Sequence, residues 1–172
     1  MSWVVLFLAV LWFERPSRAS IILDATTRSV EVLLGGAVTT NQLPFVAAWA
    51  DHTTTTFTPG QQNGATNNTT AVTMVSAPAA STQRQVKTVT VFNADTVNAT
   101  VTVRYNDNAT TRILVRTVLE PNWTLQFSDV SGWTVIDENG SLQYSSSGII
   151  PLASGGTAGA LRASNGAVVY ST

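Results

Sequence analysis

Cysteine is absent from the 172-residue chain, so disulfide bonds, zinc–thiolate sites and cysteine nucleophiles are excluded. The single histidine, His52, also excludes a metal site built from several histidines. Charged residues make up only 11% of the chain, the net charge is −1, and Lys87 is the sole lysine. This composition cannot supply the basic surface that nucleic acid requires, which argues against a nucleic-acid partner.

Long apolar runs are missing as well. The longest covers residues 3–13, has 11 residues, and is followed by Glu14, Arg15 and Pro16. A membrane-spanning helix needs about 20 apolar residues, so no membrane span is predicted. The run resembles the apolar centre of a secretion signal, with 17–19 as a cleavage site, although no basic residue precedes it. Residues 1–20 are therefore set apart as an apolar leader, which is a signal, an anchoring helix or a fortuitous upstream extension.

Alternating apolar and polar residues dominate the stretch 85–127. Within it, Val101, Val103 and Tyr105 alternate with Thr100, Thr102 and Arg104, the period of two that predicts a half-buried strand. Segments 86–92, 110–119 and 123–127 show similar patterns, and the turn-forming residues 106–109 lie between two of them. These four strands are expected to form one antiparallel meander. In its third strand, Ile113, Val115 and Leu119 are expected on one face.

Further short strands are predicted on both sides of this stretch, at 30–34, 45–51, 70–75, 133–136 and 142–144. The Gly-, Gln- and Asn-rich segment 59–68 predicts the longest polar loop, and 77–84 predicts a flexible link. Residues 137–140 predict a tight turn. Short strands at this spacing are typical of an all-β protein, and we expect a jelly-roll-like antiparallel β-sandwich over 21–144. Residues 145–172 are rich in Gly, Ala and Ser and predict an extended C-terminal tail.

Two parts of the chain resemble tailed-bacteriophage fibre and minor virion proteins. The first part is ILDATTRSVEVLLGGAVTTNQLPFVAAW at 22–49 with SAPAASTQRQVKTVTVFNADT at 76–96. Gly132–Trp133 and the turn 137–140 match the usual end of such an N-terminal β-domain. The second part, PLASGGTAGALRASNGAVVYST at 151–172, is similar to the connector repeats of long tail fibres. The spans that these motifs mark, 22–140 and 151–172, cover about four-fifths of the chain, but the leader and the stop at Thr172 depart from the family pattern.

The resemblance implies a non-enzymatic structural component of a phage virion, namely a tail- or capsid-fibre domain for assembly or host attachment. Its implied partners are further copies of itself in a homotrimer, other virion proteins and a host-surface glycan. Val168, Val169 and Tyr170 are the candidate oligomer contacts, because they form an open apolar strand edge. The alternative is a secreted or surface β-sandwich that binds carbohydrate.

A catalytic site is weighed first at Asp51 and His52, which lie beside Thr53 and Thr54. These residue types could make a hydroxyl nucleophile with its base. However, neighbours on a strand point to opposite faces, so the sequence predicts a solvated edge, no catalytic residues and no cofactor.

Metal and ligand sites are weighed next. Asp107, Asp129, Asp137 and Glu138 lie in predicted turns and could ligate calcium or form a glycosidase pair. The segment 137–140 lacks the later glutamate of a calcium loop, so we expect turn stabilisation and no metal. Trp123, Trp49 and Trp133 are the candidate ligand-stacking residues, with core packing as the favoured role.

Overall fold

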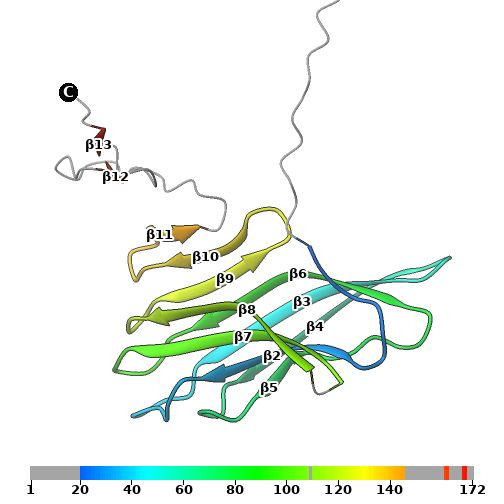
Figure 1. Ribbon diagram of the computed structural model, residues 1–172, viewed down its shortest axis with the longest axis horizontal. Helices are drawn as coiled ribbons and strands as arrows, with labels where there is room; N and C mark the ends of the chain where they lie inside the picture. The colour runs from blue at the N-terminus through cyan, green and yellow to red at the C-terminus, as the bar shows by residue number, and fades with distance from the viewer. Residues whose placement is uncertain (1–19, 109, 146–160, 163–167, 170–172) are drawn as a thin grey trace, which may run out of the picture.

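The computed structural model describes residues 20–108, 110–145, 161–162 and 168–169. All regular structure in these residues is β-strand, arranged in two antiparallel sheets around one core, with a separate strand pair (Figure 1). This confirms the predicted all-β sandwich. The strands are β1 (Ile21–Leu23), β2 (Arg28–Leu34), β3 (Pro44–His52), β4 (Phe57–Ala65), β5 (Val72–Val75), β6 (Gln83–Phe92), β7 (Ala99–Asp107), β8 (Thr110–Leu119), β9 (Thr124–Ser128), β10 (Gly132–Ile136), β11 (Leu142–Ser145), β12 (Leu161–Arg162) and β13 (Val168–Val169).

The larger sheet has the strand order β11-β10-β9-β6-β3-β4, and the smaller sheet has the order β5-β2-β7-β8. The smaller sheet lies across the larger one, and β9, β10 and β11 extend beyond it (Figure 1). Strand β1 pairs with β6 through Ile21 and Val86, whereas β9 begins its pairing with β6 at Thr88. Both strands therefore lie along the same edge of β6, one after the other.

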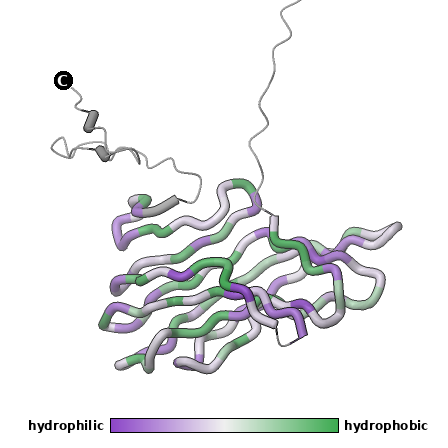
Figure 2. Tube along the Cα trace, in the orientation of Figure 1, coloured by the Kyte–Doolittle hydropathy of each residue, from purple (hydrophilic) through white to green (hydrophobic). Residues whose placement is uncertain are grey.

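The core follows directly from the alternation of apolar residues, which Figure 2 shows as green and purple bands along most strands. Val30, Val32 and Leu34 point inward from β2, while Val89 and Val91 point inward from β6. Burying each such side chain contributes about 1.5–3 kcal/mol. The largest fully buried side chains include Phe127, Leu23, Leu43, Met74, Leu119 and Leu125.

The predicted meander over 86–127 is wrong. Strands β6 and β9 pair with each other in the larger sheet, and only the hairpin β7–β8 forms as expected, in the smaller sheet. The cause is a polar corner at Asn93, which is fully buried. Its side-chain amide donates to the carbonyl oxygens of Val97 (3.0 Å) and Leu119 (2.9 Å). These bonds hold together the crossing from β6 to β7 and the return from β8 to β9.

The predicted polar loop at 59–68 is also wrong, because most of it is the edge strand β4. Gly60 lies opposite Trp49 and Gly64 lies opposite Phe45 on β3. A Cβ atom on these glycines would come within 2.5 Å and 2.7 Å of the respective aromatic rings. The glycines thus leave room for the rings across the strand, and Pro59 is tolerated because β4 pairs on one side only.

Two β-bulges set which side chains face the core. Between β7 and β8 the register shifts at Val103 and Arg104, so Ile113 lies opposite Arg104 and is 57% exposed, whereas Leu119 is buried. The prediction that Ile113 and Leu119 share one face is therefore wrong. In β6, Lys87 is unpaired opposite β3, which keeps both Val86 and Val89 on the buried face. The predicted link 77–84 is shorter than expected, since β6 already begins at Gln83.

Both ends of the chain lie mainly outside the described residues. The sandwich begins at Ile21, where the sequence places the end of the leader, and only Ser20 of the leader is described. In the tail, β12 pairs with β13 through Leu161 with Val169 and Arg162 with Val168. Tyr170 is not among the described residues. The jelly-roll variant, the extended tail and the oligomer contact at 168–170 stay predictions.

Candidate functional site

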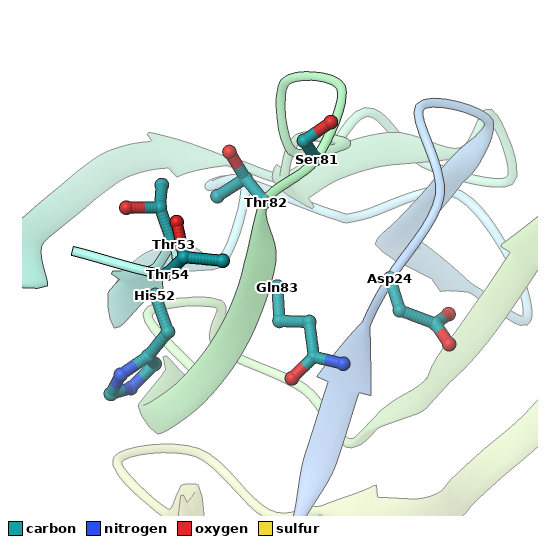
Figure 3. A pocket seen from close by; sticks show the side chains of 7 residues that line it. All are labelled: Asp24, His52, Thr53, Thr54, Ser81, Thr82 and Gln83. Carbon is teal, nitrogen blue, oxygen red and sulfur yellow. The ribbon is translucent and has the colours of Figure 1, made fainter. Parts of the chain in front are cut away.

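A shallow pocket of about 420 Å³ lies where β3 ends and β6 begins (Figure 3). It collects the residue types weighed for catalysis, and its lining is Asp24, His52, Thr53, Thr54, Ser81, Thr82 and Gln83. Figure 3 shows the His52 ring and the Asp24 carboxylate far apart, with Gln83 between them. The pocket does not bring an acid, a base and a hydroxyl together.

His52 contacts a neighbouring ring instead of a carboxylate. Its imidazole lies edge-on to Phe57, with 5.2 Å between the ring centroids. The hydroxyl of Thr53 accepts hydrogen bonds from the backbone N–H groups of Thr55 and Thr56, so it stabilises the hairpin turn. Asp51 points away from His52 and binds Arg84, as expected for neighbours on a strand. This geometry gives no activated nucleophile here.

Arg84 is a buried cation that the sequence placed in a flexible link. Its guanidinium binds both carboxylate oxygens of Asp51, at 2.7 Å and 2.8 Å. It also donates to the backbone oxygen and the hydroxyl of Ser76, and lies 4.5 Å from the ring centroid of Trp49. This arrangement joins the inner side of the larger sheet to the segment that follows β5. Its role is structural, and alternation alone could have flagged Arg84, since it shares a face with Val86.

The three candidate stacking tryptophans come from separate places. Trp49 is half-buried beneath Arg84, and Trp133 is only 8% exposed and packs on Phe127 at a centroid distance of 5.0 Å. Trp123 is half-buried against the core just before β9. Strands β6 and β9 separate Trp49 from Trp133, so these two do not form one platform.

Three of the four carboxylates weighed as calcium ligands bind the protein itself, and the fourth, Glu138, is exposed. Asp137 accepts hydrogen bonds from the N–H groups of Asn139 (2.9 Å) and Ser141 (2.7 Å), which confirms the predicted turn. Asp129 pairs with Lys87 at 3.0 Å, and Asp107 accepts from Arg28 at 3.2 Å. In the described part of the chain, no three acidic or histidine side chains gather in a way that could hold a metal ion.

Asp95 is a structural carboxylate that the sequence did not reveal. It is 4% exposed, and its oxygens accept hydrogen bonds from the backbone N–H groups of Thr39 and Thr40, both at 2.7 Å. The Thr39 N–H is the largest cause that holds the pKa of Asp95 below its ordinary value; burial opposes it but is outweighed by this and further amide donors. The only signal for Asp95 in the sequence is its place two residues after Asn93.

The outer face of the larger sheet is the feature with functional potential. Pairing aligns one row of side chains across five strands, and a second row runs beside it. The first row is Asn63, Val46, Thr90, Gln126 and Thr134, and the second is Gln61, Ala48, Thr88, Ser128 and Gly132. Thr134 and Gly132 on β10 are buried, so the exposed part of these rows lies on β4, β3, β6 and β9. None of these residues is charged, and Val46 is 49% exposed. Phe92, next but one to Thr90 on β6, adds a partly exposed ring. We call this surface the neutral face.

The charged side chains of the described residues lie elsewhere, and most of them form ion pairs or hydrogen bonds within the chain. The ion pair of Lys87 with Asp129 borders the neutral face, immediately beside Thr88 and Ser128. On the outer side of the smaller sheet, Arg104 binds Glu31 at 2.9 Å. The neutral face is therefore a surface without charge, on a chain in which most of the charged side chains of the described residues bind one another or the backbone.

Comparisons with protein-family models, curated proteins and solved structures find no match to this chain. What the fold and the sites define is an all-β sandwich with a neutral face and internally bound charges. The described part of the chain contains no apolar helix of membrane-spanning length.

Proposed function

We propose that this chain is a non-enzymatic structural component of a phage particle, a tail- or capsid-fibre domain that serves assembly or host attachment. The observation that carries the proposal is the neutral face, a broad surface suited to close packing against another protein. The resemblance of 22–49, 76–96 and 151–172 to fibre and minor virion proteins supports the same function. The pocket around His52 offers no competing arrangement for catalysis.

Mass spectrometry of virus particles, purified from the source that carries the gene, tests this function. We expect the chain in the particles at a copy number that is a multiple of three. Its absence from particles, together with its presence in a secreted or cell-surface fraction, would contradict the proposal.

We further propose a homotrimer, built on a jelly-roll-like sandwich with an extended tail. Light scattering on the full chain and on a chain that ends at Ser145 tests this assembly. A trimer that needs the tail would support the contact at Val168, Val169 and Tyr170. A trimer that persists without the tail would place the contact on the sandwich.

The alternative function is binding of carbohydrate at a cell surface or in secretion. One observation favours it: a depression of about 310 Å³ on β3 and β4, lined by Val46, Gln61, Gln62 and Asn63. Amide side chains donate and accept hydrogen bonds at once, as sugar hydroxyls require. Retention on a neutral polysaccharide column, lost on substitution of Gln61 and Asn63 by Ala, would favour this alternative.

A further inference from the structure

We infer that the neutral face is the surface through which copies of this chain contact one another. This inference rests on the proposed structural function and adds to it the location of the interface. Its starting point is the exposed pair Val46 and Phe92, which stand among hydroxyl and amide side chains. An apolar anchor surrounded by neutral polar groups is the usual anatomy of a protein interface.

The absence of charge favours a second copy as the occupant. When a chain meets itself across a two-fold axis, every charge on the contact surface is present on both partners, and like charges brought together weaken binding. A face without charge avoids this cost in any orientation. A foreign partner of opposite charge, by contrast, would find nothing complementary on it. Both halves of the face, β3–β4 and β6–β9, are uncharged, so a head-to-tail contact of one half on the other also buries no unpaired charge; such a contact forms a ring where its rotation closes.

The size of the face fits the centre of an interface. The four strands that expose it are about 4.8 Å apart, and a length of about 17 Å, which includes the row of Phe92 and Thr124, gives roughly 330 Å² in projection. Side-chain relief increases the accessible area. A standard interface buries about 800 Å² per partner, so neighbouring surface must supply the remainder.

The other exposed surfaces fit a second copy less well. Strand β8 is a long edge of the smaller sheet with exposed Ile113 and Val118, but it carries Arg112 and Arg116. Pairing two such edges would bring four guanidinium groups together. Strand β4 is blunted as an edge by Pro59.

The experiment compares two valines of nearly equal exposure on opposite outer faces. Val46 is 49% exposed on the neutral face, and Val118 is 51% exposed on β8. We expect Val46→Lys in the full chain to weaken self-association on the order of 100-fold or more, measured by sedimentation equilibrium, because it buries a charge without a partner. Val118→Lys is expected to associate like the wild type. Thr90→Glu, with the opposite charge, should reproduce the effect of Val46→Lys, and far-UV circular dichroism checks that each variant is folded.

The outcomes separate the inference from the proposed function. If the wild type associates and Val46→Lys and Thr90→Glu associate equally well, the interface lies elsewhere and only the inference is overturned. Loss of association in Val118→Lys alone would move the interface to the smaller sheet. If the wild type stays monomeric at all concentrations, both the inference and the proposed assembly are overturned. A monomer whose retention on neutral polysaccharide is lost in Val46→Lys would establish the face as a glycan site instead.

Discussion

At the scale of single residues, the fold depends on polar side chains whose partners lie far away in the sequence. Arg84 is the clearest case, since it binds Asp51, Ser76 and the Trp49 ring from the inner side of the larger sheet. The ion pair of Arg84 with Asp51 is mostly shielded from water, with side chains 11% and 22% exposed. Breaking such a pair is costly because the remaining charge stays partly buried.

We therefore predict that Arg84→Ala lowers the free energy of unfolding by about 3 kcal/mol, measured by urea denaturation. The double variant Arg84→Met with Asp51→Leu removes both charges and should recover at least half of that loss. The control is Arg116→Ala, which removes an exposed side chain bound to Thr102 and should change stability by less than about 0.5 kcal/mol. A loss below about 1 kcal/mol for Arg84→Ala would contradict the structural role of this pair.

Asp95 gives a prediction about pH. Its pKa in the folded protein is below the ordinary value of 3.8, so its stabilising effect is fully present above that value and is lost as the pH falls through the folded pKa. Asp95→Asn should therefore melt at a lower temperature than the wild type at pH 7. Thermal melts from pH 7 to pH 2 should show this difference shrinking towards zero at the acid end. A difference independent of pH would mean that the carboxylate charge is irrelevant.

At the scale of elements, β4 shows where a local reading of the sequence fails. Its Pro59, Gly60 and Gly64 are typical loop residues, yet the strand forms because Trp49 and Phe45 on β3 need the space above the two glycines. We predict that Gly60→Ala destabilises the protein by about 1–3 kcal/mol, since the Trp49 ring must move out of its packed position. Gly36→Ala, with no atom within 4 Å of the added carbon, is the matched control and should be nearly neutral. Equal effects of the two changes in urea denaturation would contradict this account.

Elements with regular alternation were predictable, and elements set by distant partners were not. The apolar positions of β2, β7 and β9 follow a period of two, so their strands and inward faces could be read directly from the sequence. The bulges at Lys87 and near Ile113 depend on the neighbouring strand and leave no local signal. The same limit applies to the neutral face. Each of its strands shows uncharged outward residues, but only the pairing of Val46 with Thr90 and of Thr90 with Gln126 joins them into one surface.

At the scale of the whole molecule, the two sheets are connected through the corner at Asn93. The chain leaves the larger sheet after β6, makes the β7–β8 hairpin in the smaller sheet and returns at β9. Asn93 binds both crossings, because its backbone N–H donates to Trp123 and its side chain donates to Val97 and Leu119. One amide therefore fixes the positions of two connections between the sheets.

Substitutions at Asn93 test the role of this corner, because they predict the direction in which stability changes with pH. Asn93→Ala should lower the free energy of unfolding by about 2–3 kcal/mol, since the buried carbonyl oxygen of Leu119 and the partly buried one of Val97 lose their donor. Asn93→Asp should be at least as damaging at pH 7, because a carboxylate would face those same oxygens. Protonation restores one donor, so the pKa of the new carboxyl is expected to be raised, and a raised pKa contributes stability at low pH that is lost as the pH rises. The deficit of Asn93→Asp relative to the wild type should therefore shrink between pH 7 and pH 5 in urea denaturation.

The matched control, Asn98→Asp, changes an exposed amide five positions along the chain and should show a small deficit that does not depend on pH in this range. If both variants behaved alike, the Asn93 amide would not be what holds the two crossings together.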